Sequence, residues 1–178
     1  MANPSFEEII SCPNNYGQID SIIGWSTLLN GGGGTPDFFH SCSFSVAVGV
    51  PSNLFYSFQY PHSGNSYIGI EVADSYSNPL WEYIQSKLKK SLSTGQLYCI
   101  KYYVSKLDYT NAYIETLGAY LDNGNVSAIP PYGLATVTPQ VYNISQPLND
   151  TVNWMKIEGS FVATGYENYI TIGNFLLI

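Results

Sequence analysis

The sequence predicts an all-β protein, folded as an antiparallel β-sandwich in which residues 1–178 form a single domain. Its composition is typical of strands joined by turns, with 16 Tyr, 16 Gly and 10 Pro in 178 residues. Apolar and polar residues alternate in successive short segments, as they do in half-buried strands. Blocks rich in Ala, Leu, Glu and Lys do not separate these segments, so the crossover helices of a parallel sheet are not expected.

The first third of the chain is expected to contain little regular structure. Residues 5–9 are predicted to form a short strand and residues 18–25 a short extended stretch. The glycine-rich run at 30–34 is predicted to be a loop, because consecutive glycines lose too much backbone entropy in a regular element. It lacks the Lys-Ser or Lys-Thr pair and the helix of a phosphate-binding loop. Residues 38–58 are expected to be irregular.

Most of the predicted strands lie in the rest of the chain, where alternating segments are bounded by turn-forming residues. These strands are residues 66–72, 81–88, 96–105, 114–121, 154–163 and 169–175, with an edge strand within the polar excursion at 136–141. Short strands at this spacing, without helices between them, indicate an antiparallel arrangement.

The segment 96–105 is predicted to be the central strand of the fold. One of its faces is expected to join the core and carries Tyr98, Ile100, Tyr102 and Val104. The opposite face carries Cys99, Lys101, Tyr103 and Ser105. Because a lysine and small polar groups lie on that second face, we expect it to be partly open to solvent and available to a ligand.

The charge balance limits the classes of partner. Six basic residues oppose 13 acidic ones, and the net charge of −7 disfavours a nucleic-acid backbone or an anionic membrane. An apolar run of the length that spans a membrane is not found in the sequence. The start, residues 1–5, lacks the basic and apolar regions of a secretion signal. The low charge and many tyrosines nevertheless favour an extracellular or cell-surface protein, and we expect that the signal was removed and Met1 was supplied for expression.

The three cysteines leave two interpretations open. Cys12 and Cys42 lie in loop-like surroundings, whereas Cys99 lies within a predicted strand. We therefore predict a disulfide between Cys12 and Cys42, with Cys99 a small, partly buried apolar side chain. The alternative is three unrelated free thiols. A metal site built on cysteine is not expected, because no closely spaced pair occurs.

Several short motifs, taken in their order and spacing along nearly the whole chain, resemble a known pattern. They are Asn3-Pro4-Ser5-Phe6-Glu7, Ser11-Cys12-Pro13, Gly34-Thr35-Pro36-Asp37-Phe38-Phe39, Gly49-Val50-Pro51, Pro61-His62-Ser63-Gly64-Asn65-Ser66-Tyr67, Glu82-Tyr83-Ile84-Gln85, Thr94-Gly95-Gln96-Leu97-Tyr98, Asn153-Trp154 and Tyr169-Ile170-Thr171-Ile172-Gly173-Asn174-Phe175. The pattern resembles galactose-binding-like jelly-roll domains, a class that includes carbohydrate-binding modules. In its finer detail it resembles such domains in secreted, gliding-motility-associated and OmpA-family surface proteins of Bacteroidetes. The resemblance implies a jelly-roll β-sandwich, an extracellular location and a non-catalytic role.

A jelly-roll fold would place several predicted outward-facing side chains on one ligand-binding surface. They are Tyr83, Gln85, Lys101 and Tyr103, with Tyr109 and Asn111 at the rim. Aromatic rings stack on the apolar face of a sugar, while amides and charged groups hydrogen-bond to its hydroxyls. The alternative is that long loops cover this face and these side chains pack beneath them.

The resemblance also implies a structural calcium ion near the chain termini. Glu7 occupies the acidic position of the first strand, and Asn174 stands where many relatives have an aspartate. Calcium prefers several oxygen ligands, so Asn174 removes a charge that the site would otherwise have. Asp37 is a further candidate ligand, although its turn also suits a carboxylate that caps loop amides.

The sequence gives little support for catalysis. His40 and His62 are far apart in the sequence, and the motifs of a serine hydrolase or a zinc enzyme are not found. We therefore expect a non-catalytic binding or adhesion module for a glycan or cell-surface polysaccharide. The alternative is a structural subunit that associates with copies of itself, and a glycan-active hydrolase is a third candidate.

Overall fold

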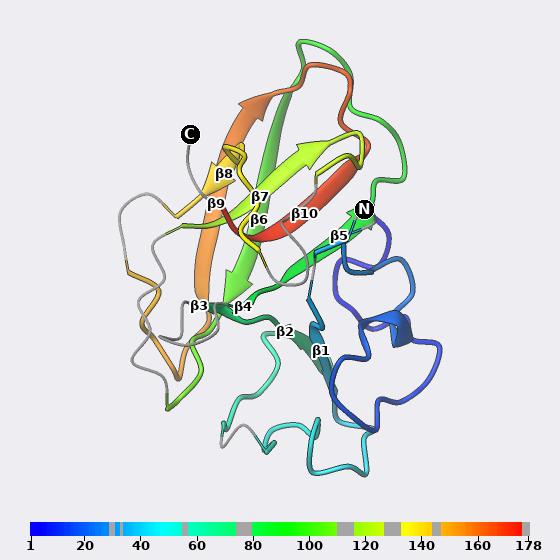
Figure 1. Ribbon diagram of the computed structural model, residues 1–178, viewed down its shortest axis with the longest axis vertical. Coiled ribbons are helices and arrows are strands. Elements are labelled where there is room, and N and C mark those ends of the chain that lie inside the picture. Colours follow the sequence, from blue (N-terminus) through cyan, green and yellow to red (C-terminus); the bar gives the residue numbers. More distant parts are fainter. Residues whose placement is uncertain are drawn as a thin grey trace.

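A computed structural model describes residues 1–28, 31–32, 34–54, 57–73, 80–109, 116–126, 133–143 and 147–175 (Figure 1). The regular elements of these residues are one 3-10 turn and short strands, and every named strand pair is antiparallel. In chain order they are η1 (Ile19–Ser21), β1 (Asp37–His40), β2 (Ser66–Gly69), β3 (Val72–Ala73), β4 (Leu80–Trp81), β5 (Tyr83–Lys87), β6 (Leu97–Val104), β7 (Leu117–Asp122), β8 (Val141–Tyr142), β9 (Met155–Val162) and β10 (Tyr169–Asn174).

The strands form two main layers with the core between them, which confirms the predicted antiparallel sandwich. One layer is the four-stranded sheet β5-β10-β7-β8, and the other is the long pair β6-β9 (Figure 1). Ile172 and Ala119 of the first layer belong to the same apolar cluster as Ile100 and Phe161 of the second. A second cluster joins Leu117 and Val141 to Ile157 in the same way. The shorter pairs β1-β2 and β3-β4 complete the described sheets.

The segment at 96–105 forms β6, and the predicted alternation along it is confirmed. Ile100, Tyr102 and Val104 pack into the core, whereas Cys99 and Lys101 are exposed. The prediction of a central strand is wrong, because among the described residues β6 forms a ladder with β9 alone. The central positions belong to β10 and β7. Residues 170–173 of β10 are buried without alternation because both faces of that sheet are covered.

The first third of the described chain has little regular structure, as expected, but three of its segments differ from the prediction. Residues 5–9 and 18–25 are turns, a single bridge between Ile9 and Ile22, and the 3-10 turn η1. The side chain of Asn3 replaces a strand ladder here, since its amide accepts from the backbone N–H of Glu8 and donates to carbonyls of Glu8 and Ile23. Strand β1 was not predicted. Phe38 and Phe39 within it are both buried, so period-two alternation is absent from its sequence.

The predicted strands of the rest of the chain are largely confirmed. The predicted strand 66–72 is divided between β2 and β3, and the predicted strand 81–88 between β4 and β5. Strands β9 and β10 match the predicted segments, and β7 matches 114–121 except for residues 114–115, which lie outside the described residues. The predicted edge strand at 136–141 is reduced to the two residues of β8, which does lie at the edge of its sheet.

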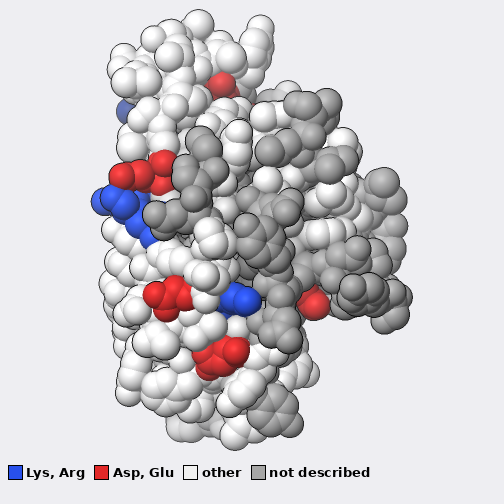
Figure 2. Space-filling view, turned by 90° about the vertical axis from the view of Figure 1, so that its left-hand side faces the viewer, with Lys and Arg blue, Asp and Glu red and all other residues white. Residues whose placement is uncertain are grey.

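The surface of the molecule is sparsely charged. On the face shown in Figure 2, acidic and basic side chains lie in small separate groups among uncharged surface. Lys156 and Glu158 of β9 form an ion pair with a Nζ–Oε1 distance of 2.7 Å. Both side chains are about half exposed, so this pair adds little to stability.

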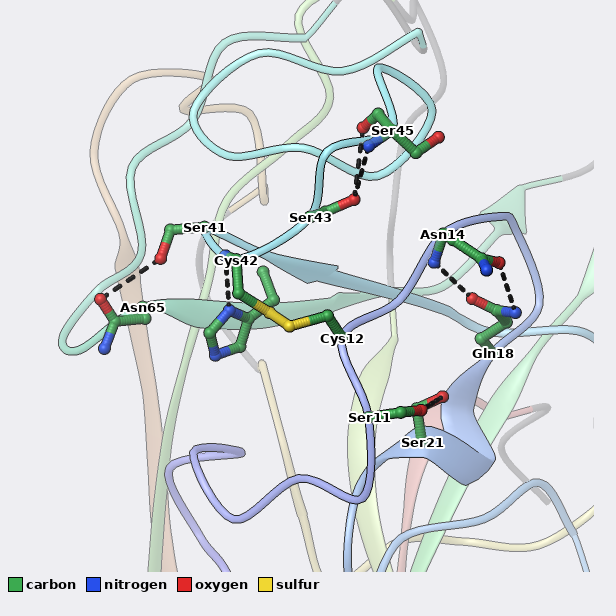
Figure 3. The surroundings of a disulfide bond; sticks show 11 residues. Ser11, Cys12, Asn14, Gln18, Ser21, Ser41, Cys42, Ser43, Ser45 and Asn65 are labelled. Carbon is green, nitrogen blue, oxygen red and sulfur yellow. Dashed lines mark hydrogen bonds between the residues drawn. A yellow bond between two sulfur atoms is a disulfide. The ribbon is translucent and has the colours of Figure 1, made fainter.

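The predicted disulfide between Cys12 and Cys42 is present, with a Cα–Cα distance of 5.9 Å (Figure 3). It joins the loop that precedes η1 to the turn that follows β1. The same turn is held by His40, whose Nδ1 accepts from the backbone N–H of Cys42. Cys99 is a free thiol on the exposed face of β6, so the prediction that it is partly buried is wrong.

Candidate functional site

The predicted ligand-binding surface is not assembled as expected, because two of its members face a covered side of the sheet. Tyr83 is 0% and Gln85 1% exposed, so the prediction that they face solvent is wrong. The Tyr83 hydroxyl donates to the Asn174 carbonyl at 2.6 Å and accepts from the Ala135 N–H at 2.8 Å. Burial raises the pKa of Tyr83 to about 12. Gln85 donates to the hydroxyl of Thr171 at 2.9 Å.

A third apolar cluster explains this burial. It covers the face of the four-stranded sheet that is turned away from β6 and β9, and its buried members are Leu28, Tyr83, Val126, Ala135 and Phe175. Most of these cluster members lie outside the regular strands. Loops therefore bury side chains that sequence alternation alone predicts to be exposed. For Tyr83 and Gln85, the alternative that the side chains pack beneath loops therefore agrees with the structure.

The other predicted ligand-binding residues lie apart from Tyr83 and Gln85. Lys101 is exposed on β6 opposite Glu158 of β9. Tyr103 is half-buried and stacks on His62, with ring centroids 3.7 Å apart. Tyr109 is 80% exposed, and Asn111 lies outside the described residues.

The three predicted metal ligands each bind a different part of the protein. Glu7 accepts hydrogen bonds from Ser66 and from Asn65. Burial opposes ionisation of Glu7, but these hydrogen bonds together lower its pKa. Asn174 accepts from the Thr116 hydroxyl and donates to the Val72 carbonyl. The side chain of Asp37 accepts from the Gly17 N–H at 2.7 Å, as expected for a carboxylate that caps loop amides.

A set of at least three His, Cys, Asp or Glu side chains suited to a metal ion is not found in the described part of the chain. Asp37 does lie close enough to Glu82 and Glu71 for their charges to act on it. Burial is the main cause that raises the pKa of Asp37 to about 6, and these two carboxylates add to it. Glu82 itself accepts from the backbone N–H groups of Thr35 and Glu71.

The structure contains a groove that the sequence did not predict. It has a volume of about 590 Å³, within the range of small-molecule sites. It lies where β6 ends and β9 begins, at the lower end of these two strands in Figure 1. Three segments line it, with the residues Phe58, Gln59, Tyr60, Pro61, His62, Asp108, Thr151, Val152, Asn153 and Trp154. We call this site the aromatic groove.

Hydrogen bonds between the three segments fix the walls of the aromatic groove. The carboxylate of Asp108 accepts from the backbone N–H of Phe58 at 2.8 Å. The indole N–H of Trp154 donates to the carbonyl of Tyr60 at 2.9 Å. Behind the wall, Ser105 donates to the side-chain oxygen of Gln59 at 2.9 Å. The groove is therefore preorganised rather than formed by independent loops.

Aromatic rings dominate the open surface of the groove. Phe58 and Tyr60 are 55% and 63% exposed and meet edge to face, with centroids 5.4 Å apart. The ring of Trp154 meets the rings of His62 and Tyr67 at centroid distances of 6.2 Å and 5.9 Å. Tyr103, which was predicted as a ligand residue, supports His62 from the far side of its ring.

Sequence reasoning missed Phe58, Tyr60, Asp108 and Trp154 as site residues for a definable reason. Asp108 is 50 residues from Phe58 and Trp154 is 94 residues from Tyr60, so no local pattern shows that they meet. The available signals were the aromatic residues at 58–62 and the position of Trp154 at the start of the predicted strand 154–163. The predicted Tyr109 directly follows Asp108, so two of the six predicted residues, Tyr103 and Tyr109, adjoin the groove.

Comparison with protein-family models, with curated proteins and with solved structures finds no match for this chain. The galactose-binding-like family and its surface proteins thus remain a prediction. A helix of the length and apolarity needed to cross a membrane is not present among the described residues.

Proposed function

We propose that this chain is a non-catalytic, extracellular binding module whose aromatic groove binds carbohydrate. The observation that carries the proposal is the combination of exposed rings with hydrogen-bonding groups in one preorganised groove. Phe58 and Tyr60 offer apolar surface to the face of a sugar ring, and Asp108 and Asn153 offer acceptors to its hydroxyls.

The covalent structure supports the extracellular part of the proposal. Disulfides persist in oxidising compartments, and the Cys12–Cys42 bond agrees with such a location. The antiparallel sandwich agrees with a galactose-binding-like jelly roll, which is the fold we propose for the domain. From the resemblance of the sequence motifs we also propose that it is part of a secreted or cell-surface protein of the Bacteroidetes type.

The test is a glycan array followed by titration of any glycan that binds. We expect saturable binding that falls about fivefold in Tyr60→Ala and in Phe58→Ala, because each loses a stacking surface worth about 1 kcal/mol. Tyr166→Ala is the matched control, since Tyr166 is 77% exposed and does not line the groove. Absence of any glycan ligand, or an equal loss in the control, would contradict the proposal.

Self-association is the second candidate function, and exposed apolar side chains favour it. Phe44 is 104% and Val46 69% exposed on the turn next to the disulfide. Leu97 and Val162, opposite each other on the outer face of β6 and β9, are 62% and 60% exposed. Sedimentation over a range of concentrations tests this function. Oligomers that dissociate in Phe44→Ser or Leu97→Ser would favour it over the binding module.

A further inference from the structure

Some hydrogen-bonding groups of the aromatic groove bind other protein groups, whereas one carboxylate oxygen does not. The indole N–H of Trp154 and the amide nitrogens of Gln59 and Asn153 each donate to a protein oxygen. Asp108 uses one oxygen, Oδ2, to accept from Phe58. Among the described residues, its Oδ1 accepts no hydrogen bond. The groove therefore offers a ligand a charged acceptor, the Oδ1 atom of Asp108.

The charges around the groove have one predominant sign. Asp108 lines it, whereas no Lys or Arg is among the described lining residues. Asp150 directly precedes the lining residues 151–154, and N–H groups of Asn153 and Val152 lower its pKa. Lys106 binds the Asp150 carbonyl through its backbone N–H and does not line the groove.

We propose that the aromatic groove selects glycans that carry a free amino group, and that Asp108 is the residue that determines this specificity. The inference rests on the proposed carbohydrate-binding function and narrows its ligand class. A protonated amino sugar presents hydroxyl groups, an apolar ring face and an ammonium group. The ammonium group complements the Asp108 carboxylate, and a charge-assisted hydrogen bond is stronger than one between neutral groups.

Neutral sugars fit the same rings but lack the ammonium group, so they bind more weakly. Uronic acids place a second carboxylate beside Asp108, and like charges at short distance repel each other. The expected order of affinity is therefore amino sugar, then neutral sugar, then acidic sugar. The net charge of −7 acts in the same direction over longer distances, so the test has to separate the local carboxylate from the overall charge.

Calorimetric titration at pH 6 with three short oligosaccharides of equal length separates the effect of the Asp108 carboxylate from that of the overall charge. The probes are a glucosamine oligomer, its N-acetylated neutral counterpart and a galacturonic acid oligomer. In Asp108→Asn we expect the affinity for the glucosamine oligomer to fall about tenfold, the loss of one charge-assisted hydrogen bond. Affinity for the neutral oligomer should change less than about twofold. Affinity for the acidic oligomer should increase, because the repelling carboxylate is removed. The asparagine oxygen still accepts from Phe58.

Glu158→Gln is the matched control, because it changes the net charge equally at an exposed position on β9. It should leave all three affinities unchanged. If it acts like Asp108→Asn, or if the wild type binds the acidic oligomer as well as the amino one, the inference is wrong while the proposed function stands. If none of the oligomers binds and the glycan array is also blank, the proposed function itself fails.

A folding defect in Asp108→Asn would appear as a lowered melting temperature. In that case the salt dependence of the wild type decides the question. Preference for the amino sugar over the neutral one should decrease between low and high salt, because screening weakens charge attraction. A preference that does not change with salt would contradict the inference.

Discussion

Asp37 begins β1 with its carboxylate near Glu82 and Glu71, and this position makes its ionisation unfavourable. Burial is the main cause that raises its pKa to about 6, and the two neighbouring carboxylates add to the effect. The Gly17 N–H opposes the shift. Between about pH 4 and pH 6 the folded protein therefore binds a proton at Asp37 that the unfolded chain releases.

The sign of the resulting pH dependence follows directly. Where the folded state holds more protons than the unfolded state, the free energy of unfolding falls as pH rises. Asp37 therefore destabilises the fold progressively between about pH 4 and pH 6, and its full destabilising effect is present above that range. We expect Asp37→Asn to be more stable than the wild type at pH 7.5 and equally stable near pH 4. Urea unfolding at several pH values measures this difference, and a difference that is constant with pH would contradict the prediction.

Tyr83 offers a second test at a single residue. Its buried hydroxyl binds both the Asn174 carbonyl and the Ala135 N–H. Tyr83→Phe leaves these two groups without their partner, so we expect the free energy of unfolding to fall by about 1–3 kcal/mol. Tyr109→Phe should change it by less than about 0.5 kcal/mol, because exposed sites tolerate substitution. Equal effects of the two changes would show that the Tyr83 hydroxyl is not structural.

At the scale of elements, covalent and side-chain links compensate for the scarcity of regular structure before β2. The Cys12–Cys42 bond closes a loop with a sequence separation of 30 residues. Asn3 and Trp25 hold the chain start through side-chain hydrogen bonds, since the Trp25 indole donates to the Asn3 carbonyl at 2.9 Å. Ile19, Ile22 and Phe38 of this first segment, residues 1–42, lie in the same apolar cluster as Ile84 and Ile170 of the four-stranded sheet.

The disulfide should therefore contribute measurably to stability. We expect the double variant Cys12→Ser/Cys42→Ser to lose roughly 3–4 kcal/mol, the chain-entropy value for a loop of this length. Cys99→Ser is the control and should lie within about 0.5 kcal/mol of the wild type, because its thiol is exposed. Thermal unfolding compares the three proteins. A double variant as stable as the control would mean that side-chain contacts alone hold the first segment.

On the scale of the whole molecule, the protein has few charged residues and several exposed apolar side chains. The net charge of −7 at pH 7 provides repulsion between copies. This charge approaches zero near the sequence pI of about 4.5. We expect solubility to be lowest near that pH and to recover on either side. Light scattering as a function of pH measures this, and Phe44→Ser should reduce the scattering at its maximum. Scattering that is independent of pH would contradict a charge-limited solubility.

Much of the fold was predictable because burial on one face leaves a period of two in the sequence. The alternation in β6, β7 and β9 identified these strands and most of their core positions. Alternation failed at Phe38, where consecutive residues are buried, and at Gln85, where loops cover the second face. The candidate site was predicted less well. Tyr103 and Tyr109 adjoin the groove, but its principal residues, Phe58, Asp108 and Trp154, come from irregular segments.

The amino-acid sequence by itself determined the antiparallel sandwich and most of its core-facing positions, and it favoured the Cys12–Cys42 pairing. Local alternation and the loop-like surroundings of two cysteines contain that information. Only the tertiary structure decided which sheet face is covered and where exposed aromatic rings meet. Those features depend on contacts between loops distant in sequence, such as Trp154 with Tyr60 and Asp108 with Phe58. The pattern of neighbouring residues in the sequence does not indicate such contacts.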